Sequence, residues 1–420
     1  MNQLTHSKNT TILPRLIPLV LACFALLPSP ALADVVTDWN AIALQTVFSA
    51  VPPRPGPSAI LDLAMVQAAV HDAIQAFQRR FEPYAIAIPD ASGSPVAAAA
   101  VAAHDVLAAR FPSQAADLDM RLQTYLSDRG LLGDAGIDIG HQAAAAIISV
   151  RTGDGSFPPN PEVFLGGNGP GEWRPTLPAF APMATPWLAT VTPFTLKDAA
   201  QLQAAPPPTP LNSGEYVRDY NEVKALGSIN STERTPEQTA LAVFYAGNFI
   251  DLWFRTLQGI AETNLSDIGD SARLFALSGL ASADAFITAW SSKRYWNFWR
   301  PITAIQEGDN DGNSRTVGDP NWLPFLPTPP YPDYTSGATN LTGAMTRTLK
   351  YFFGDRTIFS MTSTTSNTTM VYHRFSDAAS DVVSVRVYQG IHFRSADEVA
   401  RRQGSAAADW AFSHFLRPME

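Results

Sequence analysis

The sequence predicts a mainly α-helical fold in which two packed helix bundles are joined by a long Pro/Gly-rich connection. Apolar residues recur at steps of three and four residues through most of the chain, which is the period of an amphipathic helix. No run of alternating polar and apolar residues is long enough to indicate an extensive sheet. Of the 420 residues, 46% are hydrophobic and 10% are aromatic, a composition that excludes a disordered chain.

The charge and the cysteine content exclude several classes of protein. The formal net charge of -9 argues against nucleic acid or an anionic membrane surface as a partner, because both would require a basic face. The single cysteine, Cys23, excludes a disulfide framework and a metal site built from thiolates. The sequence therefore predicts an acidic globular protein with a large apolar core.

Residues 1–33 have the pattern of a signal peptide. Lys8 and Arg15 precede the apolar run LIPLVLACFALL, and the ALA that ends at Ala33 has the small-x-small form of a signal-peptidase site. The apolar run is about 12 residues long and a membrane span needs roughly 20, so we expect no span after signal removal. A lipoprotein signal ending at Cys23 is the alternative. Either route predicts an exported protein, periplasmic or secreted.

An N-terminal helical bundle is expected over residues 34–151. Four Ala-rich segments show the helical period and should pack closely on one another: 58–80, 96–111, 115–127 and 135–150. His71 and Asp72 lie in the first of these, interpreted as the first helix of the mature chain. A buried structural hydrogen bond explains them better than catalysis does.

The Pro/Gly-rich connection is expected over residues 152–234. From Thr152 to about Pro210 neither the helical nor the strand period persists, and FPPNPEVFLGGNGPGEW and AAPPPTP are dense in helix breakers. We interpret this stretch as a long surface connection.

A C-terminal helical domain is expected over residues 235–420. Thr235 is typical of a helix N-cap, with Pro236 at the first helical position and Gln238 able to bond back to the cap. Segments with the helical period then run through Leu257 and over 266–299, 336–353 and 374–390.

The first candidate motif is KRYWNFWRP. Lys293 and Arg300 are seven residues apart, which would place them two turns apart on one face of a helix that Pro301 ends. Two cations on one face among Trp and Phe side chains are unusual. Both could also extend to solvent from an ordinary amphipathic helix.

The second candidate motif is TPPYPDYTSGATNLTGA. Its Pro-rich approach keeps the chain extended, and Ser336 and Gly337 then open a helix. A helix start of this kind presents free backbone N–H groups and a hydroxyl, which suit an anion. An ordinary Ser cap followed by a flexible Gly is the alternative.

The third candidate motif is SVRVYQGIHFRSAD. Arg386 and Gly390 are one helical turn apart, and His392 follows where a helix could end and direct the ring inward. A lone His is usually a hydrogen-bonded core residue. Three cations, a helix start and one His within 100 residues instead describe a pocket for a tetrahedral oxyanion.

The ordered set Lys-x6-Arg-Pro, Ser-Gly and Arg-x3-Gly-x-His resembles the signature of the vanadium-dependent haloperoxidases and the type 2 phosphatidic acid phosphatase superfamily. Further stretches resemble bacterial haloperoxidase-like members: AMVQAAVHDAIQAFQRRFEPY, YNEVKALGS, AIQEGDNDGN and DPNWLPFLPTPPYPDY. The resemblance covers most of the mature chain. Each motif is weak alone, whereas the ordered set is specific.

The resemblance implies a vanadate cofactor, which phosphate can mimic, and a reaction in which hydrogen peroxide oxidises halide for transfer to a small organic acceptor. It implies that His392 binds the metal through a ring nitrogen and that Lys293, Arg386 and His392 are catalytic. The groups implied to hold the oxyanion's oxygens are Lys293, Arg300, Ser336, the amide of Gly337 and Arg386. Tyr331 is implied to flank the oxyanion, and Trp290, one turn before Lys293, is expected to form another wall.

The chain departs from the family pattern at the second motif. Ala338 follows Ser336-Gly337 where the family has a His that acts as acid and base, a role typically worth about 10²–10⁴-fold. In the third motif, Val385 stands where Ser commonly precedes the Arg, and Asp397 falls five residues after His392, which puts its pairing with that His in doubt. Oxyanion binding is therefore better supported than turnover.

Three interpretations follow from these residues. The first is a haloperoxidase-like enzyme with weakened or altered activity, which with a weak acid should favour bromide over chloride. The second is an acid-phosphatase-like phosphoester hydrolase, and the third is a non-catalytic oxyanion-binding descendant. A calcium loop at Asp309 to Gly312 is disfavoured, because Gly318 occupies the position of the required carboxylate.

Overall fold

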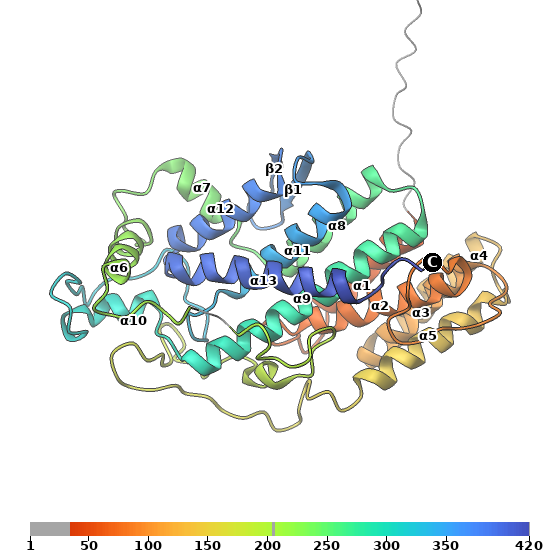
Figure 1. Ribbon diagram of the computed structural model, residues 1–420, viewed down its shortest axis with the longest axis horizontal. Helices are drawn as coiled ribbons and strands as arrows, with labels where there is room; N and C mark the ends of the chain where they lie inside the picture. Colours follow the sequence, from red (N-terminus) through yellow and green to blue (C-terminus); the bar gives the residue numbers. More distant parts are fainter. Residues whose placement is uncertain (1–33, 204–205, 420) are drawn as a thin grey trace, which may run out of the picture.

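A computed structural model of the protein describes residues 34–203 and 206–419. The predicted signal peptide, with Cys23, lies outside the described residues. Within them the chain is mainly helical, as the sequence predicts, and carries one two-stranded sheet. In Figure 1, α3, α4 and α5 lie at one end of an elongated molecule, and α6 and α10 lie at the other.

Five α-helices form the N-terminal half, with the 3-10 helix η1 (Pro112–Gln114) before the fourth: α1 (Val35–Phe48), α2 (Ala59–Gln78), α3 (Pro95–Arg110), α4 (Ala115–Asp128) and α5 (Gly136–Arg151). The last four confirm the predicted helices. The first was not predicted, so the helix that carries His71 is the second of the mature chain. Asp34 marks the start of α1, because its carboxylate accepts hydrogen bonds from the N–H groups of Val36 and Thr37.

The connection contains more structure than the sequence indicated. It holds the 3-10 helix η2 (Pro186–Thr190) and the unpredicted α6 (Gly214–Leu226), which Ser213 caps through the N–H of Tyr216. Trp173 and Leu188 are fully buried. The interpretation as a surface connection is therefore wrong in part, since these side chains bury the segment against the helices.

The C-terminal half holds the remaining elements: α7 (Pro236–Phe244), α8 (Phe249–Asn264), α9 (Ile268–Trp296), α10 (Pro301–Gln306), η3 (Gly308–Asn310), α11 (Gly337–Phe353), β1 (Phe359–Ser363), β2 (Thr368–Tyr372), α12 (Phe375–Tyr388) and α13 (Arg394–His414). The Thr235 cap is confirmed, with Gln238 closing the capping box. The segment through Leu257 is two helices, because Asn248 caps a new one. The hairpin and α13 were not predicted; β1 and β2 pair antiparallel, with Phe359 opposite Tyr372.

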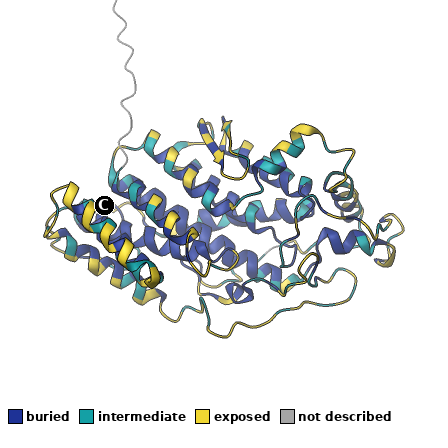
Figure 2. Ribbon diagram, turned by 180° about the vertical axis from the view of Figure 1, so that it is seen from behind, coloured by how far each residue is buried: buried dark blue, intermediate teal, exposed yellow. Residues whose placement is uncertain are grey.

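The 29-residue helix α9 joins the two halves. It packs on α2 from the first half and on α11 and α13 from the second. Among the described residues it is the one helix long and apolar enough to cross a membrane, but 94% of its most apolar window is buried inside the protein, as in a core helix. One apolar cluster runs from Val35 to Leu416, so the bundles share a continuous core. Figure 2 shows this buried centre and the exposed outer faces of the peripheral helices.

Candidate functional site

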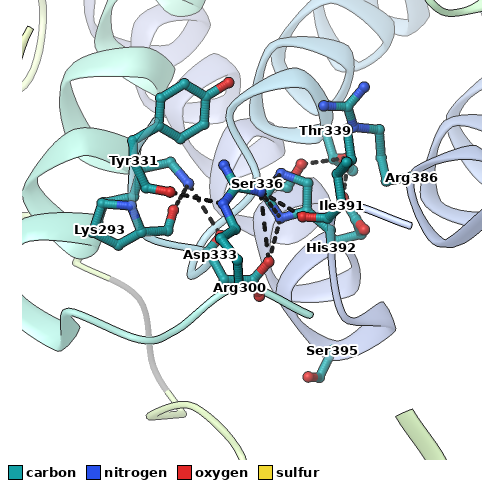
Figure 3. A network of polar contacts seen from close by, with 12 residues as sticks. Lys293, Arg300, Tyr331, Asp333, Ser336, Thr339, Arg386, Ile391, His392 and Ser395 are labelled. Carbon is teal, nitrogen blue, oxygen red and sulfur yellow. Dashed lines mark hydrogen bonds and ion pairs between the residues drawn. The ribbon is translucent and has the colours of Figure 1, made fainter. Parts of the chain in front are cut away.

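Four helix termini meet at one place in the fold, and the structure brings the predicted site residues together there (Figure 3). Lys293 lies in the last turn of α9, and Arg300 is the N-cap of α10. Ser336 is the N-cap of α11, and Arg386 lies in the last turn of α12. His392 follows α12 and lies 3.1 Å from Arg300, measured from Nε2 to Nη1.

Lys293 and Arg300 do not share a helix, which corrects the prediction from their spacing. α9 ends at Trp296, and Asn297 follows in the left-handed conformation with φ of 46°. Pro301 occupies the first position of α10, where its missing N–H removes no helical hydrogen bond. The proline therefore starts a helix here, and the chain reversal between the two helices directs both cations into one site.

The start of α11 is where the second motif predicted it. Ser336 makes no side-chain capping bond, and its hydroxyl lies 3.2 Å from the hydroxyl of Thr339. Gly337 is required for packing, because a Cβ there would lie 2.9 Å from the Trp290 ring and 3.2 Å from Phe286. The first amides of α11 have no intrahelical acceptor, so this helix start can donate to an anion.

The end of α12 directs His392 into the core, as the third motif predicted. Gly390 has φ of 76°, and a Cβ there would lie 2.3 Å from the carbonyl oxygen of Gly227, so only glycine fits. The turn leaves His392 fully buried. Arg386 is anchored by a 2.6 Å hydrogen bond from Nη1 to Gln389, whose amide in turn donates to the carbonyl groups of Ala242 and Tyr245.

Asp333 is the partner of His392, and sequence reasoning missed it. Its Oδ1 lies 2.8 Å from His392 Nδ1 and 3.7 Å from Arg300 Nη1. Its backbone carbonyl accepts a 3.0 Å hydrogen bond from the Lys293 ammonium, which also donates to Pro332. The residue lies within the second motif, but its distance of 59 positions from His392 gave no signal of the pairing.

Asp397 does not pair with His392. Its Oδ1 accepts a 2.7 Å hydrogen bond from Thr339, whose hydroxyl also contacts Ser336. Because α13 starts at Arg394, Asp397 lies in its first turn and faces α11. The doubt raised by the five-residue spacing is thus resolved: the carboxylate supports the Ser336 hydroxyl through Thr339.

Burial controls the ionisation of the site. Loss of water, and secondarily the neighbouring Arg300, lower the pKa of Lys293 well below its ordinary value. Burial and the three cations also lower the pKa of His392 well below its ordinary value, so its imidazole is neutral. Burial raises the pKa of Asp333 to about 8 and that of Asp397 to about 7.

A neutral imidazole suits a ligand role. A proton on Nδ1, 2.8 Å from Asp333 Oδ1, places the lone pair on Nε2. Nε2 lies 3.1 Å from Arg300 Nη1, and a metal ion bound there would displace this contact. Asp333 lies behind the ring at ion-pair distance, and neither of its oxygens makes a hydrogen bond among the described residues. In its ionised form it would fix both the tautomer and the orientation of the ring.

Unpaired donors at the site fit an oxyanion. Nη2 of Arg300 and Nε of Arg386 are buried and have no hydrogen-bond partner among the described residues. Lys293 gives two of its three N–H bonds to carbonyl groups, which leaves one for a ligand. These groups, with the Ser336 hydroxyl and the start of α11, are the donors a tetrahedral oxyanion needs, and a buried donor left without a partner is costly. The residues present therefore fit vanadate or phosphate.

A cavity of about 340 Å³ opens onto the site, and we call it the site cavity. Its wall is mainly apolar and carries Arg386, Tyr331, Trp290, Gly337 and Ala338. Lys293, Arg300 and His392 are fully buried behind this wall. The rings of Trp290 and Tyr331 lie 4.9 Å apart, so the two expected aromatic walls are adjacent.

Other sequence features lie outside the site. His71 Nε2 contacts the carbonyl of Glu82, and the Asp72 carboxylate accepts three backbone N–H bonds, so both are structural, as expected. The carboxylate of Asp309 accepts a hydrogen bond from the Gly318 amide. Among the described residues, no group of three or more His, Cys, Asp or Glu side chains is arranged to hold a metal ion.

Comparisons with known proteins show a likeness at the level of sequence and fold. Residues 273–420 match the family model of the VCPO second helical-bundle domain. The vanadium chloroperoxidase of Curvularia inaequalis is 27% identical over 188 aligned residues, which cover 36% of this chain and 30% of that relative.

Solved structures resemble the whole fold. A bacterial vanadium-dependent iodoperoxidase has a TM-score of 0.77 at 24% identity, covering 91% of this chain and 97% of that one. A bacterial vanadium-dependent chloroperoxidase in its holo form has a TM-score of 0.67 at 18% identity, covering 91% and 93%. The chain is therefore vanadium haloperoxidase-like in its mainly α fold and in the sequence of residues 273–420.

Proposed function

From this likeness, we propose that the protein is a vanadium-dependent haloperoxidase that binds vanadate in the pocket between Lys293, Arg300, Ser336, Arg386 and His392. The carrying observation is the pair of buried, unpartnered N–H groups on Arg300 and Arg386 beside a neutral imidazole. Cations without a bound anion would repel one another, and only part of that repulsion is relieved by Asp333.

Each residue of the pocket has a separate role in this proposal. His392 would offer Nε2 as the metal ligand, and Asp333 would hold the Nδ1 proton on the far side of the ring. Lys293, Arg300, Arg386, Ser336 and the Gly337 amide would hold the oxygens. Bound vanadate supplies a Lewis-acidic centre at which hydrogen peroxide is activated to oxidise halide. The apolar walls exclude water and strengthen each charged contact.

The proposed partners are hydrogen peroxide, a halide and a small organic acceptor. The site cavity, with its mainly apolar wall, is the route by which they reach the cations. Because Ala338 carries no proton donor, we expect turnover below that of a site with a His at this position.

The test compares two reactions of one preparation. Protein incubated with orthovanadate and desalted is assayed for peroxide- and bromide-dependent halogenation, and vanadate-free protein for hydrolysis of an activated phosphomonoester. We expect halogenation that requires vanadate. The His392→Ala variant should lose vanadium retention, whereas the control His373→Ala, at an exposed residue, should keep it.

Other outcomes would assign the site differently. Phosphoester hydrolysis without halogenation would favour the acid-phosphatase-like alternative. Tight vanadate and phosphate binding with neither reaction would favour the non-catalytic alternative. Failure to retain vanadium would refute the proposed cofactor.

We also propose that the protein is exported. The support is the signal pattern that ends at Ala33. N-terminal sequencing of the mature protein should give Asp34 as the first residue, and a lipid-modified Cys23 would indicate the lipoprotein route instead.

A further inference from the structure

The site cavity lacks the acid that the reaction requires. Oxidation of a halide by hydrogen peroxide to hypohalous acid and water consumes one proton. Ala338 lies on the cavity wall where the family has a His. Among the described residues that line the cavity, Arg386 and Tyr331 alone carry ionisable side chains, and an arginine does not give up its proton. Tyr331 is therefore the available donor.

The backbone of Tyr331 is fixed by the site itself. Its carbonyl accepts a 2.7 Å hydrogen bond from Arg300 Nε, and the next carbonyl, of Pro332, accepts one of 2.6 Å from Lys293. The two cations that would hold the oxyanion therefore also position this segment. A side chain anchored in this way presents its hydroxyl at a defined place.

The ring of Tyr331 lies between the buried cations and the site cavity. The Lys293 ammonium lies 4.8 Å from the ring centroid and the Arg300 guanidinium 4.7 Å, both within cation–π distance. Trp290 packs on the same ring at 4.9 Å. In Figure 3 the hydroxyl points away from the Asp333–His392 pair, and Tyr331 and Arg386 lie at opposite ends of the drawn network. Burial lowers the pKa of Arg300 and that of Arg386, and the neighbouring Tyr331 opposes this lowering to a smaller extent.

We propose that Tyr331 is a catalytic residue whose hydroxyl donates a proton to hydrogen peroxide in place of the His absent at position 338. This inference rests on the proposed haloperoxidase function. The O–O bond breaks, and the halide loses two electrons as its bond to one oxygen forms. The Tyr331 proton goes to the other oxygen, which leaves as water. Solvent in the cavity then returns a proton to the Tyr331 oxygen.

The substitution Tyr331→Phe tests the hydroxyl and keeps the ring. We expect the turnover number with bromide to fall tenfold or more, in the range of a lost general acid. Vanadate and phosphate affinities, measured by calorimetry, should stay within about threefold, since the charged contacts dominate binding. The control Tyr295→Phe, at an exposed residue at the end of α9, should change neither quantity.

The absorbance spectrum of Tyr331 tests its position beside the bound anion without an activity assay. Phosphate or vanadate added to the wild-type protein should change its near-ultraviolet tyrosine absorbance, because the anion binds beside the phenol. Tyr331→Phe should abolish this difference spectrum, and Tyr295→Phe should preserve it. A spectrum unchanged in the Tyr331→Phe variant would place the hydroxyl away from the anion and overturn the proposal.

Rescue separates a chemical role from a structural one. The substitution Ala338→His in the Tyr331→Phe background should restore turnover, because an imidazole there can supply the proton. Wild-type turnover in the single Tyr331→Phe variant would overturn the inference and leave the haloperoxidase function intact. A wild-type protein that never oxidises halide would instead refute the proposed function itself.

Discussion

The pairing of Asp333 with His392 makes the strongest prediction about vanadate binding. The substitution Asp333→Asn preserves side-chain size, and the backbone stays anchored by Lys293 and by a 2.9 Å bond from its amide to the Phe298 carbonyl. An asparagine can present its NH₂ group to Nδ1, which moves the ring proton to Nε2 and blocks the lone pair that the metal requires. Loss of such a supporting group typically lowers metal affinity about 10–100-fold, or roughly 1.4–2.7 kcal/mol.

The two oxyanions should respond differently to this change. Phosphate needs no bond to the ring nitrogen, and removing a carboxylate beside three cations makes the pocket more positive. At the 3.7 Å between Asp333 and Arg300, one charge pair is worth about 4 kcal/mol at an effective dielectric constant of about 20. Most of this is absent near neutral pH, because burial raises the pKa of Asp333 to about 8 and leaves the group largely protonated. Phosphate affinity should therefore be unchanged or higher.

Calorimetric titration of both oxyanions against wild-type and Asp333→Asn protein measures the effect. Asp311→Asn is the control, since Asp311 is also buried but bonds to Thr316 away from the site. We expect vanadate affinity to fall at least tenfold relative to phosphate affinity. Equal losses for both oxyanions, or no loss for either, would refute the assignment of Asp333 as the group that orients His392.

Four further predictions follow from the same site. Ala338→His should raise halogenation turnover tenfold or more and leave vanadate affinity within about threefold; a briskly active wild type that gains nothing would show that the site is not impaired. Bromide should be oxidised faster than chloride under matched conditions. Equal or faster chlorination would contradict the inference that the site has only a weak proton donor. Burial raises the pKa of Asp397 to about 7, so the folded state holds a proton that the unfolded state releases above about pH 4. The free energy of unfolding should therefore fall as pH rises from about 4 to 7, by up to about 1.4 kcal/mol per pH unit. Urea titrations of Asp397→Asn should show a smaller dependence on pH. Equal pH dependence of the unfolding free energy in the variant and the wild type would contradict the raised pKa. Gly337→Ala should lower the free energy of unfolding by about 1–3 kcal/mol in the same assay, because its Cβ would lie 2.9 Å from Trp290, and an unchanged value would show that the ring can move.

Local signals in the sequence predicted most of the helices. The cap at Thr235 was predicted correctly, but the helix that it starts ends at Phe244 and does not continue through Leu257. α1 was missed although Asp34 caps it, because the segment follows directly on the signal pattern. α13 was missed because its polar face is wide, and α6 because it lies in a region defined by its prolines and glycines.

The sequence predicted which residues belong to the site, but it did not predict which elements carry them or which of them pair. The motifs identified Lys293, Arg300, Ser336, Arg386 and His392, and the structure brings them together. Helical spacing placed Arg300 on the wrong element, because a left-handed Asn297 reverses the chain before it. Asp333 could not be paired with His392 from sequence, since only the packing of distant helix ends creates that contact.

The central claim is that His392 binds vanadium within this ring of cations. A crystal structure of vanadate-loaded protein, with anomalous diffraction at the vanadium edge, tests it most directly. The predicted result is one vanadium peak bonded to His392 Nε2, with its oxygens in contact with Lys293, Arg300 and Arg386. A peak elsewhere, or none in protein that retains vanadium in solution, would contradict the claim.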